Sequence, residues 1–144
     1  MKSLIVVEPP ALWERGKGMR TMRAMRVARR VAVYAQALAV HAACENKNNR
    51  VLFSNYFFQR MAETVQREIG GELVRMKWFF SSRRQIEVMW QAVENAMTAP
   101  GLDTVVLIDP VANAAVLGRL LGVERKLNPG EIIQINGKEV TKLL

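Results

Sequence analysis

The run Thr104-Val-Val-Leu-Ile108 constrains the fold of this chain more than any other segment. After its first residue it is continuously apolar, and Asp103 and Asp109 bound it on either side. A strand that is apolar on both faces is buried on both faces, as in a parallel sheet that is covered by helices. The run therefore predicts a central strand of an α/β domain.

The rest of the chain alternates between strand-like and helix-like patterns. We expect further strands at 2–7, 50–54, 72–76, 131–135 and 138–141, the last two joined by an Asn136-Gly137 turn. We expect helices at 19–43, 57–69, 82–97 and 112–121, the third opened by a capping box of Ser82 and Gln85. This order predicts a three-layer sandwich over residues 1–144 as one domain: a largely parallel sheet, helices on both faces and a C-terminal hairpin.

Composition restricts the setting in which such a domain works. The chain has 144 residues, a length that suits one domain. No apolar run approaches the roughly 20 residues of a membrane span, and the run at 4–7 is too short for a signal peptide. The single Cys44 and the single His41 provide neither an internal disulfide nor a zinc cluster. We expect a cytoplasmic protein without a metal or cofactor.

Positive charge is concentrated near the N-terminal third of the chain. The net charge is +8, which favours contact with a polyanion or an acidic protein. Within the expected first helix the candidate anion-binding residues are Arg20, Arg23, Arg26 and Arg30. A run of charges is also typical of a solvated helix face, or of a face packed on an acidic partner. Only Trp13 and Tyr34 flank this run, so base stacking has little support there.

In a parallel sheet, binding sites form at the carboxyl ends of the strands. Three such positions can be named: Glu8, the segment 56–60, and Asp109. Arg60 falls in the first turn of an expected helix, where its guanidinium and the free backbone N–H groups would suit a phosphate. The alternative is that Arg60 is an ordinary solvated helix residue.

The order of these elements resembles the histidine phosphatase superfamily, with its phosphoglycerate mutase-like fold, and is closest in size to the short phosphohistidine-phosphatase branch. The segment 4–7 stands where the family's first strand leads into Arg-His-Gly. The segment 56–64 keeps the Arg and the Thr of the family's Ser-Pro-Leu-x-Arg-Ala-x-x-Thr motif, as Arg60 and Thr64. Further on, 105–109 and Leu120-Leu-Gly122 match the second catalytic strand and the Leu-Leu-Gly that follows it, and Pro129-Gly130 resembles the closing Pro-Gly-Ser.

The departures from the family pattern concern its catalytic residues. Glu8-Pro9-Pro10 stands where the family has Arg-His-Gly, and Asp109 replaces the second His. The resemblance implies a phosphohistidine mechanism, which needs an imidazole nucleophile that Pro9 does not supply. We therefore expect a catalytically inactive domain that acts as a binding or assembly module, in which Arg60 forms an ion pair with Glu8, Asp109 or both.

Three alternatives remain open. The first is a nucleic-acid or polyanion binder that uses the arginine-rich helix. The second is a magnesium-dependent hydrolase similar to Toprim domains, built on Glu8 and Asp109, although that motif needs a second Asp where this chain has Val111. The third is a homo-oligomer assembled through Trp78-Phe79-Phe80, if these aromatic residues are exposed. We expect them to be core instead, because large aromatic side chains mostly lie inside.

Overall fold

The strands and helices follow each other along the chain as the apolar runs predict. The computed structural model describes residues 2–8, 48–79, 81–109, 113–122, 124, 127–128 and 130–143. Its elements are β1 (Ser3–Val7), β2 (Asn49–Phe53), the 3-10 turn η1 (Tyr56–Phe58), α3 (Gln59–Ile69), β3 (Glu72–Arg75), α4 (Ser82–Thr98), β4 (Thr104–Ile108), α5 (Asn113–Leu121), β5 (Ile132–Asn136) and β6 (Glu139–Lys142). The helix expected at 19–43 lies outside the described residues.

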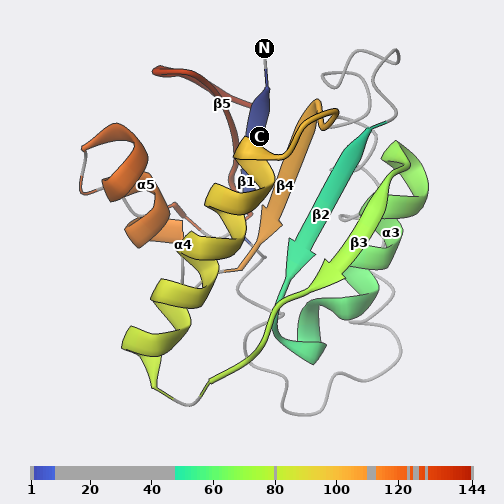
Figure 1. The fold of residues 1–144 in the computed structure, drawn as a ribbon, viewed down its shortest axis with the longest axis horizontal. Helices are drawn as coiled ribbons and strands as arrows, with labels where there is room; N and C mark the ends of the chain where they lie inside the picture. Colours follow the sequence, from blue (N-terminus) through green and yellow to red (C-terminus); the bar gives the residue numbers. More distant parts are fainter. Residues whose placement is uncertain are drawn as a thin grey trace.

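The described strands form one sheet in the order β3-β2-β4-β1-β5-β6 (Figure 1). The first four strands of the chain run parallel, and β5 and β6 add an antiparallel hairpin beside β1. In the middle of the sheet Val106 of β4 lies opposite Ile5 on one side and Val51 on the other. All five residues of β4 are buried, so the prediction of a central parallel strand is confirmed.

Helices cover both faces of this sheet (Figure 1). On one face α3 packs through Met61, Ala62 and Val65 against strand residues that include Ile5, Val51, Phe53, Val106 and Ile108. On the other face α4 and α5 pack against the alternate strand residues, with Met89, Val93, Ala96, Val116 and Leu117 covering Leu4, Val6, Leu52, Val105 and Leu107. Each fully buried aliphatic side chain contributes about 1.5–3 kcal/mol by leaving water, so the two clusters hold the three layers together.

A pair of glycines ends α3 and lets the chain turn back into β3. Gly70 and Gly71 both have positive φ values, of 75° and 96°. A Cβ atom on Gly71 would lie 2.1 Å from the carbonyl oxygen of Asn49, which no side chain can accept. The Asn49 amide in turn donates a hydrogen bond of 2.8 Å to the Ile69 carbonyl at the end of α3. This close approach fixes the end of α3 against the start of β2.

Two local predictions are shifted by one residue. The N-cap of α4 is Ser81, not Ser82, and its side chain makes no capping hydrogen bond. Gln85 does reach back over the helix start, but its Oε1 accepts the N–H of Phe79 at 2.7 Å. In the C-terminal hairpin Asn136 pairs with Glu139, so the two loop residues are Gly137 and Lys138 rather than Asn136 and Gly137.

Candidate functional site

The carboxyl ends of four parallel strands meet at one edge of the sheet. Val7 and Phe53 both pair with Ile108, and Phe53 also pairs with Arg75. The residues that follow, Glu8, Ser54, Met76 and Asp109, therefore line up along this edge. Two of the three positions expected to form a site, Glu8 and Asp109, come from neighbouring strands.

Asp109 is the most enclosed of these polar residues. Its side chain is fully buried, and its Oδ2 accepts a hydrogen bond of 2.5 Å from the hydroxyl of Ser54, which is also fully buried. The bond joins the ends of β4 and β2. Sequence reasoning had identified Asp109 as a site position but not its partner, because Ser54 looks like an ordinary last strand residue.

Glu8 is buried at the end of β1, with 5% of its surface exposed. Its backbone N–H donates to the Glu131 carbonyl at 2.9 Å, and its own carbonyl accepts the N–H of Gly130 at 3.1 Å. These bonds hold Glu8 against the segment that leads into β5. Gly130, one of the two residues that resemble the family's closing Pro-Gly-Ser, thus contacts the end of β1.

Arg60 lies apart from both carboxylates. It is the second residue of α3, its side chain is exposed, and its carbonyl accepts a hydrogen bond of 2.8 Å from the Thr64 hydroxyl. Within the described residues it forms no ion pair. The prediction of a buried ion pair between Arg60 and Glu8 or Asp109 is therefore wrong. The helix faces the sheet through Met61, Ala62 and Val65, and this orientation turns Arg60 to solvent.

Several candidate residues cannot be placed in this arrangement. Pro9 and the arginine-rich face of Arg20, Arg23, Arg26 and Arg30 lie outside the described residues. Their proposed roles stay predictions from the sequence.

Over the ranges that the structure describes, no group of three or more His, Cys, Asp or Glu side chains is placed to hold a metal ion.

In the same part of the chain no helix is long and apolar enough to cross a membrane.

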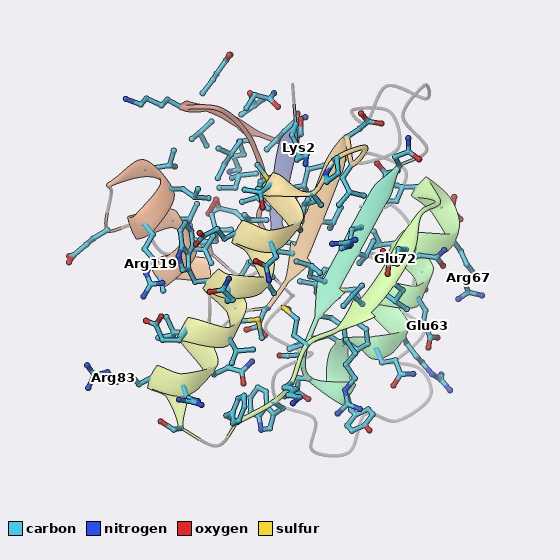
Figure 2. The ribbon with its side chains drawn as sticks, viewed as in Figure 1. Lys2, Glu63, Arg67, Glu72, Arg83 and Arg119 are labelled. Carbon is cyan, nitrogen blue, oxygen red and sulfur yellow. The ribbon has the colours of Figure 1, made fainter. Side chains whose placement is uncertain are left out.

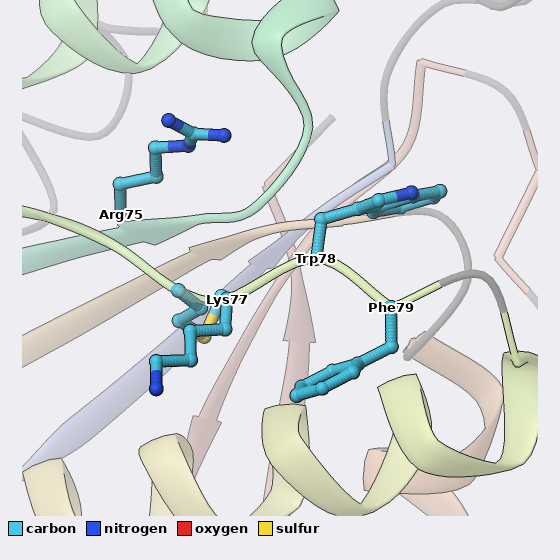
Figure 3. A pocket seen from close by; sticks show the side chains of 5 residues that line it. Arg75, Lys77, Trp78 and Phe79 are labelled. Carbon is cyan, nitrogen blue, oxygen red and sulfur yellow. The ribbon is translucent and has the colours of Figure 1, made fainter.

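A hollow that the sequence reasoning missed lies at the same edge of the sheet, where β3 ends. It has a volume of about 470 Å³ and is lined by Arg75, Met76, Lys77, Trp78 and Phe79 (Figure 3). We call it the β3 groove. Trp78 is 40% exposed, so the expectation that the aromatic cluster is core is wrong for this residue. Phe79 is half-buried.

Cations lie against aromatic rings around the β3 groove. The guanidinium of Arg75 lies 3.5 Å from the centre of the Tyr56 ring and also donates a hydrogen bond to the Tyr56 hydroxyl. Tyr56 is 65% exposed. Arg84, on α4, lies 5.7 Å from the centre of the Phe79 ring. The sequence does contain a signal for this groove, because basic and aromatic residues alternate after position 74. Considering the aromatic residues alone does not reveal this pattern.

Comparison with solved structures finds a match over nearly the whole chain. A phosphoglycerate mutase from Plasmodium falciparum superposes with a TM-score of 0.65 at 10% sequence identity, over 98% of this chain and 87% of that one. No model of a known protein family matches the chain. No curated protein matches it either. A likeness at this level of identity bears on the fold alone. It agrees with the sheet and the two helical layers described above, and the chain has the phosphoglycerate mutase-like fold.

Proposed function

We propose that this chain is a histidine-phosphatase-like domain that lacks phosphatase activity and acts as a binding or assembly module. The observation that carries the proposal is the pair of buried carboxylates, Glu8 and Asp109, at the ends of the adjacent strands β1 and β4. By resemblance, these are positions where the family has a phosphate-binding Arg and its second catalytic His.

The chemistry of these replacements supports inactivity. A phosphate dianion is repelled by a nearby carboxylate, at about 1 kcal/mol for a pair 4 Å apart even in water. Imidazole is the nucleophile of the family mechanism, and Pro9 at the corresponding position has no nucleophilic side chain. Arg60, the one phosphate-binding residue of the family pattern that is kept, has its side chain exposed on α3.

Hydrolysis of an aryl phosphate and of a phosphohistidine substrate tests the proposal, each measured with a chelator and again with magnesium. We expect no turnover above the buffer blank under either condition. Turnover that survives the chelator, and that is lost in Asp109→Asn, would show a working active site and overturn the proposal. Turnover only with magnesium would favour the carboxylate–metal hydrolase instead.

A further inference from the structure

The segment that connects β3 to α4 has an unusual composition. Its ten residues read Arg75-Met-Lys-Trp-Phe-Phe-Ser-Ser-Arg-Arg84, with four Lys or Arg, three aromatic residues and no Asp or Glu. Because β3 ends at Arg75 and α4 begins at Ser82, the segment passes along the carboxyl-end edge of the sheet. Basic and aromatic side chains are therefore brought together at the edge where sites form in α/β sheets.

The side chains of this segment spread to both sides of the backbone. Figure 3 shows Arg75 and Trp78 on one side, and Lys77 and Phe79 on the other, with Phe79 directed towards α4. Arg83 projects outwards from the first turn of α4 (Figure 2). The hollow is lined by the exposed Trp78 and by the cations Arg75 and Lys77, and Arg75 also lies against the exposed Tyr56 ring.

Among the described residues, no acidic side chain forms an ion pair with a cation of the β3 groove. The ion pairs formed between described residues are Arg50 with Glu72 and Arg119 with Glu87, and both lie outside the groove lining. Arg75 and Arg84 are instead held against aromatic rings. Lys77 is exposed. The groove thus keeps its positive charge available to an anionic ligand.

We propose that the β3 groove binds single-stranded nucleic acid, with a base stacked on Trp78 and the neighbouring phosphates bound by Arg75 and Lys77. This assignment rests on the proposed function, in that it names the ligand class of a domain that binds rather than catalyses. Aromatic platforms beside cations are how sequence-tolerant single-strand binders work: each base offers a ring face, and each phosphate offers a charge. The chain's net charge of +8 favours the same kind of partner.

Two other anionic partners fit the groove less well. A side chain that inserts into a membrane has to project beyond its surroundings, whereas Trp78 lines a hollow and has more than half of its surface covered. The carboxylates of an acidic peptide would bind Arg75 and Lys77, but such a peptide has no flat ring system to stack on the exposed indole. A nucleotide chain satisfies both features.

The experiment measures fluorescence anisotropy of a labelled oligothymidylate of about 12 nucleotides, titrated with the full chain between about 50 and 200 mM salt. Trp78→Ala removes the stacking platform, and we expect a Kd on the order of tenfold higher. Lys77→Ala removes one phosphate contact, so the slope of log affinity against log salt should fall by about 0.7. Trp78→Phe keeps a ring face and should restore most of the affinity that Trp78→Ala loses.

Lys138→Ala is the matched control. Lys138 is exposed like Lys77, but it lies in the β5–β6 turn at the amino-terminal edge of the parallel strands. It should leave both the Kd and the salt slope close to those of the unmodified chain. If Trp78→Ala and Lys77→Ala bind as Lys138→Ala does, the oligonucleotide binds elsewhere on the chain and the proposal is wrong.

Two further outcomes would also overturn the assignment. One is no oligonucleotide binding at the lowest salt concentration. The other is binding to phosphatidylserine vesicles, but not to the oligonucleotide, that is lost in Trp78→Ala. None of these results bears on phosphatase activity. Conversely, turnover in the phosphatase assay would refute the inactive-domain proposal without altering the oligonucleotide measurement.

Discussion

Asp109 forms a short buried hydrogen bond with Ser54 at the end of β4. Its Oδ2 accepts the hydroxyl of Ser54 at 2.5 Å, and both residues are fully buried. A hydrogen bond to a buried carboxylate is stronger than one between neutral groups, and its loss leaves a polar atom away from water. At the scale of single residues, this pair adds a side-chain contact to the backbone pairing of β2 with β4 at the candidate site.

Replacing Ser54 tests that contact. We expect Ser54→Ala to lower the free energy of unfolding by about 1.5–3 kcal/mol, because the carboxylate loses a donor that water cannot replace. Urea unfolding measures the change. Ser81→Ala is the control: Ser81 is exposed and makes no side-chain capping bond, so its loss should cost under about 0.5 kcal/mol. Equal effects of the two variants would contradict this role for Ser54.

Arg60 leads to the opposite expectation. Its side chain is exposed on α3 and forms no ion pair with another described residue. We expect Arg60→Ala to change the free energy of unfolding by less than about 0.5 kcal/mol, as for most surface substitutions. Thermal unfolding followed by circular dichroism is sufficient to measure it. A loss above about 2 kcal/mol would restore the buried ion pair that the sequence suggested.

Residue types alone predicted some of the residues at the candidate site. Glu8 and Asp109 were identified because each directly follows a buried apolar strand, and the register of that strand fixes where the next residue lies. Arg60 was misplaced because the side of a helix that faces the sheet depends on tertiary packing. Trp78 was misjudged because a large aromatic residue is buried more often than not, and only its neighbours in space decide the individual case.

At the scale of elements, the junction between α3 and β3 depends on its glycines. Gly71 has a φ of 96° and approaches the Asn49 carbonyl so closely that a Cβ atom would lie 2.1 Å from that oxygen. The backbone of β2 cannot move away without breaking its pairing with β3 and β4. The turn therefore accepts glycine at this position and nothing larger.

We expect Gly71→Ala to destabilise the fold by about 2–5 kcal/mol, the sum of a left-handed backbone penalty and a steric clash. Gly122→Ala provides the comparison, because Gly122 also has a positive φ, of 65°, but nothing lies within 4 Å of its added Cβ. That variant should cost only about 1–2 kcal/mol. Denaturant unfolding of the two variants side by side measures the difference, and equal losses would mean that the contact with Asn49 relaxes easily.

Most element positions were predictable, and their ends were less so. The strand at 104–108 was predicted with the bounds it has, because its apolar run is bounded by aspartates. The N-cap of α4 was placed one residue late, since either Ser81 or Ser82 suits an N-cap by residue type. The hairpin turn was also placed one residue too early. The register of β5 is set by its pairing with β1, and the residue types in the turn do not reveal that register.

At the scale of the whole molecule, alternating patterns predicted the layers, but local patterns do not give the order of strands. An apolar run of strand length indicates that a segment is buried, but it does not indicate which strands lie beside it in the sheet. The order β3-β2-β4-β1-β5-β6 places β1 between two strands that come much later in the chain. The superposition on the phosphoglycerate mutase covers 98% of the chain and supports this overall arrangement.

The position of β1 has a consequence for how the chain is made. Residues Leu4 to Val7 are fully buried in the finished sheet, between β4 and β5. During synthesis they precede β4 by roughly a hundred residues, which at about 5–20 residues per second is several seconds or more. Over that interval an apolar strand has no partner to pair with, and such a non-local pairing also closes slowly. A nascent chain of this fold therefore exposes an aggregation-prone apolar strand as it leaves the ribosome. A chaperone that binds this strand would protect it until β4 is synthesised.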